Sequence, residues 1–393
     1  MTEPHATLST GLPLIEVSGT PRERGRAHGE AAWDRIAAAL AFYEQAFAQQ
    51  TGLSWDGVLD RARGWLGPCR DFAPDLVDEM EGIAEGAGTG LLDVLALNVR
   101  GEIIYDSTFA SMAARTEAEE DRDSADGCTS FALTEGAAGD GRVYCGQNWD
   151  WRHGTAGTLA VLRVVQPPRP TVIMQIEAGQ VGRHGANSAG IALNANGLGG
   201  RFGSAVGVPQ TLIRRRVLDS ARLTDALDVL VRTRAHIASN ALLTHRSGFA
   251  VDLETTPGPC NWMYPDDGGL LVHGNHYQAG IPPQLAENYR PLASDSLLRV
   301  PRARRGLAAA RTAADPEAVR KAVHGAMSDH LGRPESLCTH PDPRTPEVRR
   351  WSTLLSSLVD LTSGEYRIAP GTPCAHDYEA LPWNLYDGPG EAG

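Results

Sequence analysis

Residues 124–151, SADGCTSFALTEGAAGDGRVYCGQNWDW, anchor the prediction of the fold. Two short apolar runs, residues 131–133 and 142–145, flank a turn that is rich in glycine. Such runs, joined by such a turn, are typical of a β-hairpin. The sequence therefore predicts a hairpin that carries Cys128 at the start of its first strand and Asp150 at the end of its second.

Cys128 has the sequence surroundings of a nucleophile, because it follows Gly127 and precedes two hydroxyl side chains. A thiol with the ordinary pKa of about 8.5 is mostly neutral at pH 7, so a catalytic cysteine needs a base. If the chain were cut before Cys128, the new α-amine, with a pKa of about 7.7–8.0, would supply that base. Gly127 would let the backbone come close as the thiol attacks the preceding carbonyl. The alternative is that Cys128 is a small buried hydrophobic residue, the usual role of a free cysteine.

The motifs D-G-C-T-S at residues 126–130 and G-Q-N-W-D at residues 146–150 together resemble the signature of the penicillin acyltransferase family. These proteins are N-terminal-nucleophile (Ntn) hydrolases, made as a precursor that cuts itself immediately before a cysteine. The resemblance implies cleavage between Gly127 and Cys128, and it makes Cys128 the nucleophile. It also implies that Asp150 orients the α-amine or assists self-cleavage. The implied fold is a four-layer αββα sandwich.

The order of the predicted elements agrees with that fold. Helical patterns dominate the first 100 residues and return at residues 209–235 and 294–327. Short strands are expected at residues 129–133, 142–147, 158–165 and 171–176, and again after residue 185. This segregation predicts an α+β protein with packed antiparallel sheets between helical layers. We expect a mainly helical segment at residues 1–127 and an Ntn-hydrolase core at residues 128–393. Within the first segment, Gly25 and Gly29 lie on one helical face, which predicts close helix packing there.

The overall composition limits the classes of partner. The chain has 393 residues and a formal net charge of −12. This charge argues against binding to nucleic acid or to an anionic membrane. The N-terminus lacks the pattern of a signal peptide, and no apolar run is long enough for a membrane span. We therefore expect a cytoplasmic protein with neither nucleic-acid nor membrane partners.

Further candidate site residues follow the hairpin. Asn194 and Asn196 belong to a glycine-rich stretch that lacks the phosphate-loop pattern, so we expect them in a strand-turn-strand unit that lines a pocket. In H-G-N-H-Y, residues 273–277, the resemblance implies that the Asn275 side chain donates a hydrogen bond to the oxyanion. His276 and Tyr277 beside it are candidate substrate contacts. The alternative is that Asn275 is a turn residue that bonds its own backbone.

One position departs from the family pattern. Relatives often carry arginine where this chain has Thr339. The departure leaves open which group, if any, meets an anionic substrate there, and Arg333 and Arg344 are candidates.

The six cysteines indicate neither a disulfide framework nor a metal site. Their spacing is irregular and contains no C-x-x-C. His273 and His276 have no neighbouring cysteine or carboxylate in the sequence that would complete a ligand set. Cys374 is the competing thiol for the role of nucleophile, but its proline-flanked loop favours a structural role. We predict no metal and no cofactor.

These features predict a self-processing cysteine amidohydrolase or acyltransferase. The expected partners are a small-molecule amide or thioester as acyl donor, water or an amine as acceptor, and the cleaved N-terminal segment as a second subunit. Two alternatives stay open. One is an uncleaved cysteine hydrolase in which Cys128 works with a distant histidine. The other is a non-catalytic binding protein on the same scaffold.

Overall fold

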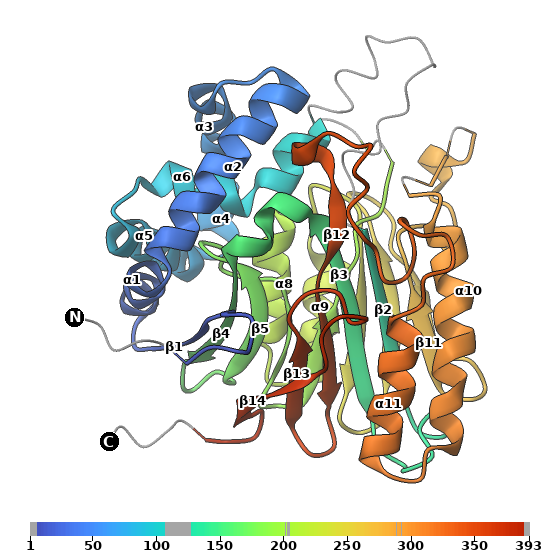
Figure 1. The fold of residues 1–393 in the computed structure, drawn as a ribbon. Coiled ribbons are helices and arrows are strands. Elements are labelled where there is room, and N and C mark those ends of the chain that lie inside the picture. Colours follow the sequence, from blue (N-terminus) through green and yellow to red (C-terminus); the bar gives the residue numbers. More distant parts are fainter. Residues whose placement is uncertain are drawn as a thin grey trace.

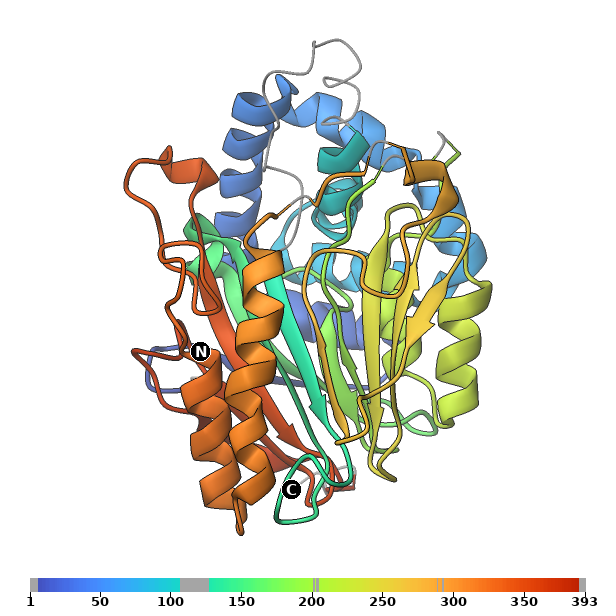
Figure 2. The same ribbon diagram turned by 90° about the vertical axis from the view of Figure 1, so that its right-hand side faces the viewer.

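The computed structural model describes residues 6–106, 127–200, 202, 205–287, 289–291 and 293–388. Two β-sheets lie face to face between two layers of helices (Figures 1 and 2). The eight-stranded sheet has the order β1-β4-β5-β6-β7-β8-β9-β10, and the six-stranded sheet has the order β11-β2-β3-β12-β13-β14. This arrangement confirms the predicted α+β fold with four αββα layers.

The strands of the eight-stranded sheet are β1 (Leu14–Ser18), β4 (Leu159–Val165), β5 (Val172–Glu177), β6 (His184–Asn187), β7 (Ile191–Asn194), β8 (Ser239–His245), β9 (Ala250–Thr255) and β10 (Asn261–Met263). Those of the six-stranded sheet are β2 (Gly127–Leu133), β3 (Tyr144–Arg152), β11 (Leu270–His273), β12 (Trp351–Asp360), β13 (Glu365–Ala369) and β14 (Glu379–Asn384).

The helices form two groups. One group consists of α1 (Pro21–Ala31), α2 (Trp33–Thr51), α3 (Trp55–Arg63), α4 (Leu66–Phe72), α5 (Pro74–Ala87), α6 (Leu91–Asn98), α8 (Gln210–Leu218) and α9 (Leu223–Arg232). The other consists of α10 (Ser296–Leu307) and α11 (Pro316–Met327), drawn in orange in Figure 1. Within the described part of the chain, no helix has both the length and the apolar character needed to cross a bilayer.

Three hydrophobic clusters hold the layers together. The first lies between the larger helical group and the eight-stranded sheet and includes Ile36 and Leu162. The second lies between the two sheets and includes Cys128 and Val161. The third lies between the six-stranded sheet and α10 with α11. Because both faces of each sheet are covered, strands such as β3, β4 and β5 are buried along their whole length, polar residues included.

The N-terminal segment is built into the core of the protein. Strand β1 pairs in parallel with β4, with Leu14 opposite Val161. Ile15 and Val17 of this strand share the first hydrophobic cluster with the helices and with the sheet. If the chain is cut after Gly127, these contacts keep the two pieces together. The predicted boundary between residues 127 and 128 stays a prediction.

The close packing predicted at Gly25 and Gly29 is confirmed, and α5 is the partner of α1. A Cβ atom at Gly25 would lie 1.9 Å from the Glu79 carbonyl oxygen, and one at Gly29 would lie 2.3 Å from that of Ile83. On α5, Gly82 makes the reciprocal close contact, because a Cβ atom there would lie 2.1 Å from the Arg22 carbonyl oxygen. Any larger side chain at these positions would push the two helices apart.

The single helix predicted for residues 209–235 is wrong, because the structure divides it into α8 and α9. The side chain of Asn187 causes the break. Its Nδ2 atom donates to the carbonyl oxygens of Leu218 and Ser220, both at 2.8 Å. These carbonyls therefore bond outside the helix, so the helical hydrogen-bond series stops there.

Candidate active site

The predicted hairpin is confirmed as β2 and β3, which pair antiparallel in the middle of the six-stranded sheet. Gly127 lies opposite Asp150, and Cys128 lies opposite Trp149. Cys128 is wholly buried, with its Sγ atom 4.0 Å from the Asp150 carbonyl oxygen. The hairpin register therefore places the backbones of Cys128 and Asp150 next to each other, whereas their side chains alternate to opposite faces of the sheet.

Asn275, in the loop after β11, contacts the predicted nucleophile directly. The backbone N–H of Cys128 donates to Asn275 Oδ1 at 2.8 Å, and Asn275 Nδ2 donates to the Gly197 carbonyl oxygen at 3.0 Å. The side-chain oxygen of Asn275 thus faces the Cys128 backbone, and its N–H group points elsewhere. The N–H donors of Cys128 and Arg299 converge on that oxygen, which explains the orientation. The predicted role of Asn275 as an oxyanion donor stays a prediction.

Arg299 on α10 is a site residue that the sequence did not indicate. Its Nη1 atom donates to the Cys128 carbonyl oxygen and to Thr129 Oγ1, both at 2.7 Å. Its Nη2 atom donates to Asn275 Oδ1 at 2.8 Å, and its Nε atom donates to Asp295 at 2.7 Å. The side chain is wholly buried. A guanidinium group with four acceptors fixes the backbone of Cys128 and places a positive charge beside it.

The carboxyl group of Asp150 is buried and feels the positive charge of Arg299. Thr353 Oγ1 donates to one oxygen at 2.6 Å, and Thr339 Oγ1 donates to the other at 3.3 Å. Burial raises the pKa of Asp150 to about 8, although the charge of Arg299 acts in the opposite direction. A carboxyl group with a pKa near neutrality is suited to exchange a proton during catalysis.

Thr339, the residue that departs from the family pattern, takes part in this site through its hydroxyl bond to Asp150. Arg333 is exposed, and Arg344 is exposed and pairs with Asp342. The arginine that touches the Cys128 backbone is Arg299, which comes from α10.

The four residues predicted to contact substrate are Asn194, Asn196, His276 and Tyr277, and the structure gives each of them its own surroundings. Asn196 Nδ2 donates to Ser130 Oγ at 3.1 Å, and its Oδ1 atom has no hydrogen-bond partner in the described part of the chain. Asn194 is also buried, at the end of β7. Burial lowers the pKa of His276 to about 4, and its ring lies 2.8 Å from a serine hydroxyl. The Tyr277 hydroxyl donates to the Gly199 carbonyl oxygen at 2.9 Å. Their contact with substrate stays a prediction.

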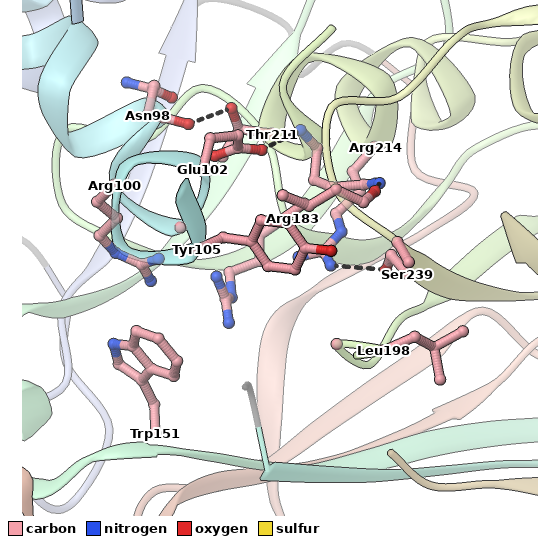
Figure 3. A pocket seen from close by; sticks show the side chains of 15 residues that line it. Asn98, Arg100, Glu102, Tyr105, Trp151, Arg183, Leu198, Thr211, Arg214 and Ser239 are labelled. Atoms are coloured by element: carbon pink, nitrogen blue, oxygen red, sulfur yellow. Dashed lines mark hydrogen bonds between the residues drawn. The ribbon is translucent and has the colours of Figure 1, made fainter. Parts of the chain in front are cut away.

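A cavity beside this site is lined by positive charge, which the sequence did not indicate. It lies next to Gly197, the residue that accepts a hydrogen bond from Asn275. Arg100, Arg183 and Arg214 line it together with Trp151 (Figure 3). Glu102 lies on the same wall, where burial raises the pKa of its carboxyl group, and Arg100 pairs with the buried Glu177. The cavity volume of about 50 Å³ is small, since sites for drug-sized ligands measure about 300–1,000 Å³. A large substrate therefore requires the site to open.

Several solved structures resemble this chain. Penicillin V acylase from Agrobacterium tumefaciens shows 16% identity and a TM-score of 0.38, over 62% of this chain and 83% of that one. A single-residue variant of conjugated bile acid hydrolase from Clostridium perfringens shows 12% identity and a TM-score of 0.44, over 67% and 95%. A second mutant of the same hydrolase shows 10% identity and a TM-score of 0.37, over 68% and 100%.

Sequence matches are stronger. A model of the family described as acyl-coenzyme A:6-aminopenicillanic acid acyl-transferase matches residues 137–371, more than half of the chain. The 40 kDa form of acyl-coenzyme A:6-aminopenicillanic-acid-acyltransferase from Emericella nidulans is 30% identical over 286 residues, which are 71% of this chain and 72% of that protein. The chain therefore belongs to the acyl-coenzyme A:6-aminopenicillanic acid acyl-transferase family, as the resemblance of its D-G-C-T-S and G-Q-N-W-D motifs implied.

Proposed function

We propose that this chain cuts itself between Gly127 and Cys128, and that Cys128 then transfers an acyl group from a small amide or thioester to water or an amine. The observation that carries the proposal is the network around the Cys128 backbone. Its N–H group bonds Asn275 and its carbonyl bonds Arg299, inside a buried site. Any buried backbone N–H and carbonyl need partners; what supports the proposal is that both partners here are polar side chains, one of them the charged Arg299.

Self-cleavage begins when the Cys128 thiol gives up its proton and Sγ attacks the carbonyl carbon of Gly127. The Gly127–Cys128 amide bond breaks, a thioester forms, and the Cys128 nitrogen leaves as an amine that takes up a proton. Asp150 lies opposite Gly127, and burial raises its pKa to about 8, so it is suited to give that proton. Water then hydrolyses the thioester, which leaves a carboxylate on Gly127 and a free thiol and α-amine on Cys128.

In the cleaved enzyme the α-amine takes the place of the Cys128 amide nitrogen. There it donates to Asn275 Oδ1, which holds its lone pair in a fixed direction. The charge of Arg299 close by disfavours protonation of the amine and so keeps it available as a base. The amine removes the thiol proton, the thiolate attacks the acyl donor, and the acyl-enzyme is resolved by water or an amine.

The arginine-lined cavity indicates the class of substrate. Arg100, Arg183 and Arg214 line it, and Arg100 already pairs with the buried carboxylate of Glu177, so a ligand carboxylate would join an existing network of arginine and carboxylate groups. The relative from Emericella nidulans is named for acyl-coenzyme A and 6-aminopenicillanic acid, both of which are anionic. We propose the same class here, an anionic acyl donor or acceptor.

Freshly purified protein is expected to consist of two pieces of 127 and 266 residues, which together make 393. Intact mass spectrometry measures both masses, and Edman sequencing of the larger piece should begin at Cys128. A full-length chain that persists on incubation at pH 7 would contradict self-processing. It would leave the uncleaved hydrolase and the binding protein as the remaining candidates.

Asn275→Ala is expected to lower the kcat of the cleaved enzyme by about 10²–10³, with a smaller change in KM. Asn275→Asp separates the two possible roles. It keeps an oxygen that faces the amine but has no N–H group to donate to an oxyanion. Activity of Asn275→Asp well above that of Asn275→Ala supports the role of orienting the amine, and equal loss supports the oxyanion role. Asn261→Ala, which removes a half-buried amide bonded to the Gly280 carbonyl oxygen, is the control and should retain activity.

A further inference from the structure

Two loops bring together four side chains that are common metal ligands. His330, Cys338 and His340 lie in the loop between α11 and β12, and Cys374 lies in the loop between β13 and β14. Their ligand atoms all lie within 4.8 Å of one another. Cys338 is buried, and His340 is half-buried at the centre of the group. No carboxylate belongs to the group, so the donor set is two sulfur and two nitrogen atoms.

Three of the six separations among these atoms are close to those of a tetrahedral site. The Nε2 atom of His340 lies 3.1 Å from His330 Nε2, 3.6 Å from Cys338 Sγ and 3.4 Å from Cys374 Sγ. A zinc ion binds sulfur at about 2.3 Å and nitrogen at about 2.0–2.1 Å, with tetrahedral angles. Those values separate two nitrogen ligands by about 3.3 Å, and a nitrogen from a sulfur ligand by about 3.6 Å. The observed separations agree with both to within about 0.2 Å, the tolerance expected for a metal site.

We propose that His330, Cys338, His340 and Cys374 bind a zinc ion. Two thiolates and two imidazoles are the ligand set that selects zinc. Two thiolates also balance the charge of the ion, so the half-buried group as a whole is neutral. Four protein ligands close a tetrahedral site and leave no position for water or substrate, which assigns the ion a structural role.

The site would join two loops next to the candidate active site. Thr339 lies between the ligands Cys338 and His340, and its hydroxyl bonds Asp150. The carbonyl of Leu337, just before Cys338, accepts from Asn148 Nδ2 on β3 at 2.8 Å. The ion therefore ties the C-terminal loop at Cys374 to the loop that holds Thr339 against Asp150. Its presence does not depend on whether the chain cuts itself.

The test is the metal content of the full chain, purified without a metal-affinity tag and dialysed against metal-free buffer. Mass spectrometry of the metal is expected to find about one zinc ion per chain. Cys374→Ser and His330→Asn replace the two exposed ligands, which limits the risk of misfolding. Both variants should lose the ion. Cys260→Ser and His245→Asn, which change the same residue types outside the cluster, should keep it.

Cobalt substitution gives a second readout that is independent of activity. Cobalt in this site should show the absorption of a tetrahedral ion and a thiolate-to-metal charge-transfer band, and Cys374→Ser should lose that band. A chain that stays metal-free after equilibration with zinc chloride would overturn the proposal. So would a disulfide between Cys338 and Cys374 in freshly purified protein, or a bound ion that survives both ligand substitutions.

Discussion

Replacing Cys128 by alanine is expected to leave a chain that neither cuts itself nor turns over an acyl donor. Both reactions need the same sulfur atom to attack a carbonyl carbon. Intact mass spectrometry should find one species of 393 residues, and turnover should fall to background. Cys145→Ala is the matched control, because Cys145 is equally buried on the neighbouring strand. Burial raises the pKa of the Cys145 thiol to about 12, which makes it a poor nucleophile, so its loss should leave cleavage intact.

Cys128→Ser gives the finer result. A hydroxyl is a weaker nucleophile at neutral pH, but it still forms an ester, so slow cleavage is expected with much reduced turnover. Alkylation with iodoacetamide identifies the nucleophile independently, since activity should decline in step with labelling of Cys128. Cys374 is exposed and needs to be followed in the same digest. Loss of activity that follows the labelling of Cys374 would show that the nucleophile has been misassigned.

Arg299→Met is expected to slow self-cleavage by about 10²-fold or more, because the Cys128 backbone loses the group that fixes its position. A misplacement of reacting groups by about 1 Å can lower a rate by about 10²-fold. The same change should move the pH profile of the cleaved enzyme, collected after long incubation. Removing the positive charge raises the pKa of the α-amine, which acts as a base only when it is unprotonated. The acidic limb of kcat/KM should therefore shift to higher pH.

A merely structural role for Arg299 would lower activity at every pH without moving the limb. Arg299→Lys keeps the charge but has fewer donors, so it should retain the position of the limb while cleavage is slowed. Arg305→Met removes an exposed arginine from the same helix and should change neither quantity. Because loss of a buried ion-paired group can destabilise a protein by about 3–5 kcal/mol, thermal unfolding of each variant belongs beside the rate measurement.

The parts of this protein that were predictable from sequence are those encoded by local pattern. The hairpin joins Gly127 to Asp150 across a short stretch in which apolar runs and a glycine-rich turn agree with one another. Gly25 and Gly29 likewise indicate close packing because only small residues allow it. Neither prediction needs knowledge of a distant part of the chain.

The rest depends on contacts between residues far apart in the chain. Arg299 lies 171 residues after Cys128 on a helix with several other arginines, so nothing in the sequence distinguishes it. The break between α8 and α9 is caused by Asn187, which lies on another element. The four candidate zinc ligands come from two loops, and their irregular spacing led us to predict no metal. In each case the pattern is created by the fold and has no periodicity to detect.

The place of β1 in the core has a consequence for how the protein holds together over time. Before the cut, residues 1–127 are joined covalently to the rest of the chain, so recovery from unfolding is an intramolecular step. If the cut occurs after Gly127, unfolding releases two separate molecules, and recovery becomes a second-order encounter that slows on dilution. The uncleaved chain can refold alone, whereas the cleaved enzyme would rely on a high barrier to unfolding. Self-processing would then replace reversible thermodynamic stability by kinetic stability, which depends on slow unfolding.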